Sequence, residues 1–384
     1  MSELNRRNFV KLSGATALGI PFLSFSDREP ELFLNKTQQK VKFTRDGIDF
    51  SPEEYAALLS KLLTKNKLVV DSYSRGGVVE DLEKKFADIL GKESAVFMPT
   101  GTLANHIAIR KLADNRKKVI VQAESHIYND SGDCAQNLSG LNLIPLAEGK
   151  TTFTLAEVKN AINRTDNGRV KTDIGAIMIE SPVRRTDNEM FDYDEMKKIS
   201  VLAIQNNIKM HLDGARLFNA VAHSKISAKE YAKLFDTVYI SMYKNFNAAS
   251  GAILAGTKEF CKDLYHIRRM FGGGMPQVWP FALVALNYAD SFLPEYKKAM
   301  RQFDNFSRII SKEKQFKIEK VTNGTNVFKL YVDTPDIESF KNKLAKENII
   351  LSNPSSESVF KLKINTTLNN MPVELLVSKF KQSV

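Results

Sequence analysis

Residues 94–105 read Ser94-Ala-Val-Phe-Met-Pro-Thr-Gly-Thr-Leu-Ala-Asn105, and this stretch indicates the architecture of the chain. Ser94 to Met98 is short and apolar, which is typical of a buried strand. The turn Pro99-Thr-Gly-Thr102 follows and opens a helix that we expect to reach Leu112. Such a turn presents backbone N–H groups at a helix N-terminus, where an anion such as phosphate binds well. Most turns of this kind bind nothing, so the turn decides little by itself.

The alternation of short apolar strands and helices continues on both sides of this stretch. Further strands are predicted at Val119–Gln122, Leu141–Leu146, Ile174–Ile179, Lys209–Leu212, Thr237–Met242 and Ala252–Ala255. Helices are predicted at Pro52–Leu63, Val78–Leu90, Thr154–Ile162 and Tyr193–Asn206. This order predicts an α/β fold with a mostly parallel central sheet and helices on both faces.

The C-terminal part of the chain has a different pattern. It is helical from Gly256 to about Lys314, and then strand-like and helical segments alternate to the end. We therefore predict a large α/β domain at residues 27–314, with an N-terminal arm at residues 27–66. Residues 315–384 are predicted to form a small α+β domain.

Composition and charge exclude several classes of protein. The chain has 384 residues, of which 43% are hydrophobic and 26% charged, so it is long enough for a large core. Its two cysteines, Cys134 and Cys261, lie in unrelated contexts, which argues against a zinc site or a disulfide framework. The net charge of +11 comes from basic residues interleaved with acidic ones, without a nucleic-acid motif. No apolar run reaches the ~20 residues that span a bilayer, so we expect neither nucleic acid nor a membrane span in the mature chain.

The first residues resemble a targeting segment. Residues 5–13 read Asn5-Arg-Arg-Asn-Phe-Val-Lys-Leu-Ser13, and a modest apolar stretch from Gly14 to Phe25 follows. A paired arginine before a short apolar region resembles a twin-arginine export signal. We therefore expect residues 1–26 to be a signal segment and the protein to be exported, to the periplasm. No Ala-x-Ala triplet marks a cleavage point, so removal of the segment and its retention as an anchor both stay open.

Reactive side chains gather at the carboxyl ends of the predicted strands, the edge at which open parallel sheets bind ligands. His126 follows the strand at 119–122, Asp213 directly follows the strand at 209–212, and Lys244 follows the strand at 237–242. Each has an ordinary explanation when it stands alone. A lone histidine is usually hydrogen-bonded or exposed, as we expect of His211, and an aspartate can simply cap a helix.

Together these side chains supply what pyridoxal 5'-phosphate (PLP) requires of a protein: a lysine, a carboxylate for the ring nitrogen, a flat group over the ring and an anion cradle. Lys244 is predicted to form the Schiff base, favoured by partial burial that lowers the pKa of its amine. Asp213 is predicted to pair with the ring N–H, and His126 to stack on the ring. Gly101, Thr102 and Ser241 are predicted to hold the phosphate.

At these residues the chain resembles the threonine aldolase and β-eliminating lyase family. The matching segments are Tyr73–Glu83, Gly91–Asn105, Glu124–His126, His211–Ala220 and Arg269–Gln277. The resemblance implies a PLP enzyme of fold type I, a homodimer or homotetramer with active sites at the subunit interface. It further implies that Arg216 lies by the substrate carboxylate or the cofactor, that Tyr73 is an active-site tyrosine, and that Lys363 replaces an arginine that grips the substrate carboxylate.

The chain also departs from the family pattern. Asn245–Ser250 replaces a turn that contains glycine and proline, and Pro276 replaces an arginine that would contact phosphate. The family's early Ser-Asp-Thr motif is not evident before Asp71. These changes make threonine itself a less secure substrate than the cofactor.

The predicted activity is cleavage of a β-hydroxy-α-amino acid to glycine and an aldehyde, with His126 or a water that it holds as the candidate base. The nearest alternative is a PLP-dependent β-eliminating lyase, or other chemistry at Cα. A third alternative is a non-catalytic exported relative that binds an anionic ligand. A dinucleotide-binding domain is disfavoured, because no Gly-x-Gly-x-x-Gly follows a strand.

Overall fold

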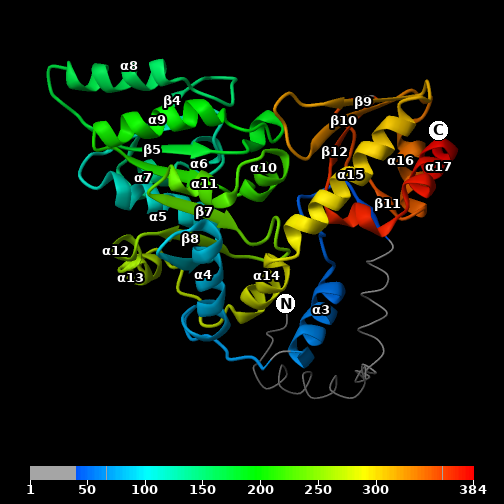
Figure 1. Cartoon of the computed structure of the whole chain (residues 1–384), viewed down its shortest axis with the longest axis horizontal. Coiled ribbons are helices and arrows are strands. Elements are labelled where there is room, and N and C mark those ends of the chain that lie inside the picture. Colours follow the sequence, from blue (N-terminus) through cyan, green and yellow to red (C-terminus); the bar gives the residue numbers. More distant parts are fainter. Residues whose placement is uncertain (1–39, 66, 357) are drawn as a thin grey trace, which may run out of the picture.

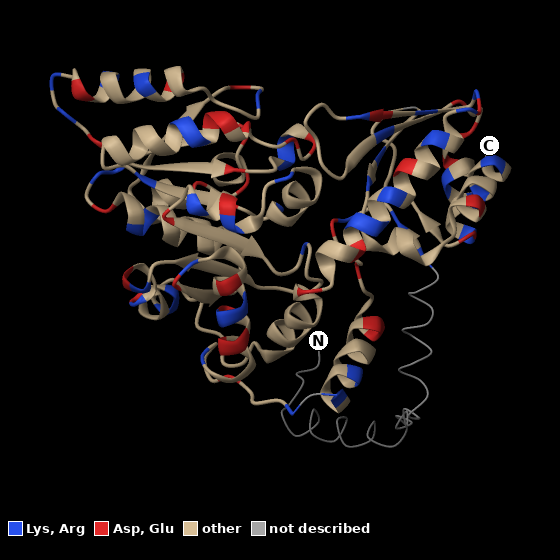
Figure 2. Cartoon of the chain, viewed as in Figure 1, with Lys and Arg blue, Asp and Glu red and all other residues tan. Residues whose placement is uncertain are grey.

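The computed structural model describes residues 40–65, 67–356 and 358–384. The predicted signal segment at residues 1–26 therefore lies outside the described residues. Two parts stand side by side in Figure 1, a larger one around the central sheet and a smaller one that holds the C-terminus. Acidic and basic residues are interleaved over both parts (Figure 2). None of the described helices is long and apolar enough to cross a membrane.

The central sheet has seven strands in the order β2-β8-β7-β6-β5-β3-β4. Their bounds are β2 (Ser94–Met98), β3 (Lys118–Gln122), β4 (Asn142–Leu146), β5 (Ile174–Glu180), β6 (Lys209–Asp213), β7 (Thr237–Ser241) and β8 (Ala252–Gly256). Strands β3 to β7 pair in parallel, whereas β8 pairs antiparallel with both of its neighbours, β7 and β2. The predicted α/β fold with a mostly parallel sheet is confirmed.

Helices cover both faces of this sheet because its strands are apolar on both sides. Ile120 of β3 packs in one hydrophobic core, and its neighbours Val119 and Val121 pack in another. The first core contains residues of α4 (Gly77–Leu90), α8 (Leu155–Asp166), α9 (Tyr193–Gln205), α10 (Leu217–His223), α11 (Ala228–Lys233) and α14 (Trp279–Ala289). The second contains residues of α5 (Gly101–Ala113), α6 (His126–Asn129), α7 (Cys134–Ser139), α12 (Lys258–Cys261) and α13 (Leu264–Met270).

Local capping explains where the helices begin. The side chain of Thr100 accepts a hydrogen bond from the Leu103 N–H at 3.2 Å and caps α5. Thr154 and Glu157 form a capping box at the start of α8. Gly91 ends α4 in the left-handed region at φ 63°.

The smaller part is a three-stranded antiparallel sheet with helices packed against it. Its elements are β9 (Phe316–Lys320), β10 (Val327–Val332), β11 (Ile349–Ile350), β12 (Val359–Lys363), α16 (Ile337–Lys346), η2 (Thr366–Asn370) and α17 (Val373–Ser383). The sheet order is β12-β10-β9, and a phenylalanine-rich core lies beneath it. Helix α15 (Phe292–Ile310) runs from the larger part into this core (Figure 1).

The N-terminal arm connects the two parts. Strand β1 (Val41–Lys42) pairs in parallel with β11, and Phe43 packs in the phenylalanine-rich core. Helix α3 (Pro52–Lys65) then packs on α14 of the larger part. The arm was predicted as a piece of the large domain, and in the structure its residues contact both parts. Its passage between them brings residues 44–51 to the carboxyl edge of the central sheet.

Candidate active site

The ends of four central strands converge on one pocket. Its lining is Gly101, Thr102, His126, Glu180, Arg184, Asp213, Ala215, Arg216, Tyr239, Tyr243 and Lys244. Lys244, Arg216 and Tyr243 also line a second, more open cavity beside the arm, together with Asp46 and Lys363. Lys244 therefore stands between two cavities, with predicted cofactor residues on one side and predicted substrate residues on the other.

Lys244 lies in the loop that follows β7. Burial lowers the pKa of its amine to about 8, and the neighbouring Arg216 guanidinium lowers it as well. Gly47 of the arm packs directly on this loop, since a Cβ at Gly47 would stand 2.3 Å from the Lys244 carbonyl oxygen. A substantial fraction of the amine is thus unprotonated near neutral pH, as nucleophilic attack requires.

Asp213 ends β6, and each of its carboxylate oxygens accepts one hydrogen bond. Its carboxylate accepts from Asn105 Nδ2 at 2.6 Å and from the Ala215 N–H at 3.0 Å. Asn105 Oδ1 lies 3.0 Å from His211 Nε2, and His211 Nδ1 lies 2.8 Å from Thr237 Oγ1. Burial lowers the pKa of His211 to about 4, so its ring is neutral. His211 is hydrogen-bonded, as predicted, and it orients the amide that holds Asp213.

His126 begins the short helix α6 and lies opposite α5. Its Nε2 is 3.1 Å from Thr102 Oγ1, and its backbone N–H donates to Glu180 Oε2 at 2.6 Å. Burial lowers the pKa of the imidazole, which favours a neutral ring near pH 7. A flat, neutral ring fixed at both its backbone and its edge can stack on a planar ligand, as predicted.

The predicted phosphate cradle has the features that an anion requires. Gly101 and Thr102 occupy the first turn of α5, whose N–H groups have no acceptor within the helix. A Cβ at Gly101 would stand 1.9 Å from the Tyr239 hydroxyl, so only glycine fits there. Ser241 is fully buried, and its hydroxyl makes no well-aligned hydrogen bond among the described residues, although it interacts with the Tyr239 hydroxyl that packs on Gly101. A helix start with free N–H groups and a buried hydroxyl with spare hydrogen-bonding capacity fit the phosphate of PLP.

Arg216 pairs with a residue that the sequence analysis missed. Its Nε donates to Asp46 Oδ2 at 3.0 Å, and both side chains are buried. Asn326 Nδ2 donates to the other Asp46 oxygen at 3.1 Å. Burial would raise the pKa of Asp46, but Arg216 and Lys363 outweigh it and lower the pKa to about 2.

Glu180 is a second residue that was missed. It ends β5, and its carboxyl accepts from the backbone N–H groups of His126 and Arg184. Burial and the nearby Asp213 raise the pKa of Glu180 to about 7. The rule that found Asp213 at the end of β6 would also have found Glu180 one strand away.

Tyr73 lies apart from these residues within one chain. It is 44% exposed, its backbone N–H donates to the Pro276 carbonyl at 2.8 Å, and the Arg269 guanidinium lies 4.9 Å from its ring centroid. It lines neither of the two cavities at Lys244. The structure therefore brings together Lys244, Asp213, His126, Gly101, Thr102, Arg216 and Lys363, with Ser241 at the end of β7, and leaves Tyr73 outside.

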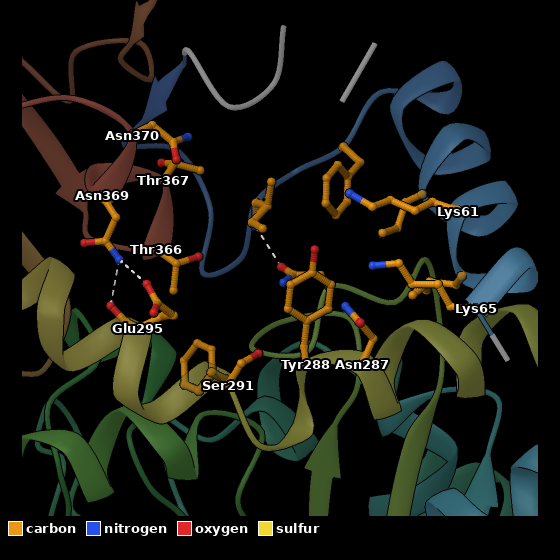
Figure 3. Close-up of a pocket in the computed structure, with 16 residues that line it drawn as sticks. Lys61, Lys65, Asn287, Tyr288, Ser291, Glu295, Thr366, Thr367, Asn369 and Asn370 are labelled. Atoms are coloured by element: carbon orange, nitrogen blue, oxygen red, sulfur yellow. Dashed lines mark hydrogen bonds between the residues drawn. The ribbon is translucent and has the colours of Figure 1, made fainter. Parts of the chain in front are cut away.

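A further cavity of about 390 Å³ lies on the other side of the arm (Figure 3). It is bounded by α3, α14, α15 and η2, and Asn369 Nδ2 donates to the Glu295 carbonyl and carboxylate there at 3.0 Å. Phe50 of the arm lines both this cavity and the open cavity at Lys244. None of the predicted catalytic residues lines this cavity, so we place the active site at Lys244. No cluster of possible metal ligands occurs among the described residues.

Comparison with known proteins identifies the class and then the family. A Listeria monocytogenes protein of solved structure, assigned as an L-allo-threonine aldolase, matches 93% of this chain and 100% of its own, with a TM-score of 0.72 and 25% identity. The family model described as beta-eliminating lyase matches residues 67–323. The chain is thus a fold-type-I PLP enzyme, and it belongs to the β-eliminating lyase family.

Two curated relatives differ in what they catalyse. The probable low-specificity L-threonine aldolase 2 of Arabidopsis thaliana is 27% identical over 312 residues, which cover 78% of this chain and 86% of the relative. The alanine racemase TOXG of Cochliobolus carbonum is 31% identical over 261 residues, 66% of each chain. The family, the cofactor and the enzymatic nature predicted from sequence are confirmed, and the non-catalytic alternative loses its support.

We predict that the Lys244 amine reacts with acetic anhydride with a pH midpoint near 8. The Asp46 carboxylate raises the Lys244 pKa, so Asp46→Asn should move this midpoint to lower pH. Mass spectrometry of the PLP-free protein would follow acetylation at Lys244 across the pH range. Asp49→Asn is the matched control, because Asp49 pairs with Arg45 and should leave the midpoint unchanged. A midpoint that rises in Asp46→Asn would contradict this electrostatic account.

Proposed function

We propose that the protein cleaves a β-hydroxy-α-amino acid to glycine and an aldehyde. The main support is the position of Lys244 between the Asp213 pocket and the cavity that holds Arg216 and Lys363. The first suits the cofactor and the second suits the α-carboxylate of an amino acid. The similarity to proteins named as threonine aldolases supports this proposed cleavage.

The residues around Lys244 have distinct roles in the proposed cleavage. Bound PLP supplies an electron sink next to the substrate Cα. Asp213 would keep the ring nitrogen protonated, and the Asn105–His211 pair holds that carboxylate in place. Arg216 and Lys363 would bind the α-carboxylate, with Asp46 fixing the plane of the guanidinium.

His126 is the candidate base for the β-hydroxyl proton. Its pKa is lowered, so a neutral ring nitrogen is available to accept a proton near pH 7. Its Nε2 lies 3.1 Å from Thr102 Oγ1, and its Nδ1 lies 3.9 Å from Asp130 Oδ2. The proton would pass to the imidazole directly or through one water, and Asp130 would stabilise the imidazolium that forms.

Two other reactions at Cα remain as second candidates. β-Elimination is suggested by the description of the family, and racemisation by the TOXG relative. All three reactions need the same lysine and the same carboxylate, and they differ in the bond that breaks. Their products distinguish them.

We expect the PLP-loaded protein to release glycine and an aldehyde from L-threonine or L-phenylserine. Lys244→Ala should lower this rate at least about a hundredfold, because the nucleophilic amine is lost. Chromatography of glycine together with an aldehyde assay measures the reaction, and Lys262→Ala, an exposed lysine, is the control. Ammonia with an oxo acid would instead indicate β-elimination, and loss of optical activity alone would indicate racemisation.

We further propose a homodimer or homotetramer in which Tyr73 serves the Lys244 pocket of another copy. Tyr73 is exposed beside Arg269 and the Gly272–Pro276 segment, away from its own Lys244. Tyr73→Ala and Lys244→Ala should each be inactive alone. Mixed dimers then contain one intact site, and random exchange would restore about a quarter of the wild-type activity. If mixing the two variants restores no activity, Tyr73 acts in the site of its own chain or in no active site.

We also propose export by the twin-arginine route, supported by Arg6-Arg7 ahead of a short apolar stretch. Replacing both arginines with lysine should retain the protein in the cytoplasm, as cell fractionation would show. Arg28→Lys, beyond the predicted signal segment, should not change its location. Unchanged export of the double-lysine variant would refute this proposal.

A further inference from the structure

Arg184 lines the Lys244 pocket on the side away from the phosphate cradle. It begins η1 (Arg184–Thr186) in the loop after β5. In the sheet, β6 lies between β5 and β7, so the Asp213 position separates Arg184 from Ser241. Arg184 is therefore poorly placed for the phosphate and faces another part of the pocket.

The loop that carries Arg184 is attached to the smaller part of the fold. Asn188 Nδ2 donates to Asn326 Oδ1 at 2.8 Å, and Lys361 Nζ pairs with Asp187 Oδ1 at 2.6 Å. Asn326 also binds Asp46, the partner of Arg216. These contacts place the loop on the side of the pocket where the substrate carboxylate would bind.

Electrostatics agree with this placement. Burial lowers the pKa of the Lys363 ammonium; Asp46 acts against this, and the guanidinium groups of Arg216 and Arg184 lower the pKa further. Three cations thus approach one region. Asp46 balances Arg216, and Lys363 makes no ion pair within the described part of the chain. Lys363 and Arg216 suffice for the single charge of an α-carboxylate, so Arg184, which pairs with Asp130, is not needed for that group.

Arg184 retains hydrogen-bonding capacity for a ligand. One of its terminal nitrogens, Nη2, donates to Asp130 Oδ2, and this bond fixes the guanidinium at the pocket mouth. A guanidinium has five N–H donors, which can bind a second carboxylate in a bidentate manner. The side chain is 45% exposed, so a ligand can reach it.

The surroundings of Arg184 offer little to an apolar substrate side chain. Ala215 contributes the only aliphatic side chain to the pocket that Arg184 lines, whereas the apolar residues of the open cavity, such as Phe50 and Ile350, do not line that pocket. A methyl group such as that of threonine would gain little burial here. An anionic side chain would gain a charge-assisted pair with Arg184.

We propose that the preferred substrate carries a second carboxylate on its β-carbon, the β-hydroxyaspartate class, and that Arg184 determines this specificity. This inference rests on the proposed aldolase function. Cleavage breaks the Cα–Cβ bond, the β-hydroxyl loses its proton, and Cα gains one. The products are glycine and glyoxylate, and no oxidant or reductant is needed.

The test compares the PLP-loaded wild type with Arg184→Gln and Arg185→Gln. Arg185 is the matched control, because it also pairs with Asp130 but does not line the pocket. We expect kcat/KM for 3-hydroxyaspartate to exceed that for threonine by at least about tenfold, the usual scale of one charge-assisted contact. Arg184→Gln should abolish this preference, mainly through a higher KM for 3-hydroxyaspartate, and the loss with threonine should be clearly smaller than the loss with 3-hydroxyaspartate. Arg185→Gln should keep the preference.

Binding gives an independent readout that does not need turnover. Spectral titration of the loaded protein with L-aspartate and L-alanine should show tighter binding of L-aspartate, and Arg184→Gln should remove the difference. If no variant releases glycine while this difference is present, the aldolase function fails and the anion specificity stands. Wild-type preference for threonine, equal loss with both substrates in Arg184→Gln, or a loss confined to PLP affinity would each overturn the inference.

Discussion

The buried ion pair between Asp46 and Arg216 is the contact on which the arrangement of the site depends. It joins the N-terminal arm to the loop after β6, and Asn326 extends it to the smaller part of the fold. Burying two charges is costly unless each finds its partner and its remaining hydrogen bonds. Asp46 satisfies this condition with Arg216 at one oxygen and Asn326 at the other. The pair therefore fixes three segments of the chain around Lys244 at once.

The charges at the carboxyl ends of the central strands also determine how the site works. Asp213, Glu180 and Lys244 lie at the carboxyl ends of adjacent strands, where burial and, after it, the charge of Asp213 raise the pKa of Glu180 to about 7. Neutral His211 and Asn105 hold Asp213 without adding charge. This leaves Asp213 free to face a cationic ring nitrogen and leaves the Lys244 amine partly unprotonated. Geometry and charge thus suit one cofactor, the one the family uses.

Much of this could be predicted from local sequence. Apolar runs located the central strands to within a residue or two, as at β3 (Lys118–Gln122), predicted at Val119–Gln122. The strand-end rule located His126, Asp213 and Lys244. The short helices α6 and α7 were missed, because four and six residues make too little periodic pattern to recognise.

The parts that were missed depend on contacts between distant segments. Asp46 contacts Arg216 across 170 residues of sequence and Asn326 across 280, so no local pattern reveals either contact. The role proposed for Arg184 depends on the contacts of the loop after β5 with Asn326 and Lys361, which lie far away in the sequence. The family resemblance implies that Tyr73 is an active-site tyrosine, but one chain's sequence does not tell which copy's pocket a side chain serves.

Covalent attachment of PLP to Lys244 is the feature on which the proposed chemistry depends, and reductive trapping tests this attachment most directly. The protein would be loaded with PLP, reduced with borohydride, digested and mapped by mass spectrometry. We expect one pyridoxyl group per chain, on the peptide that contains Lys244. Label on another lysine, or none in a folded protein saturated with PLP, would contradict it.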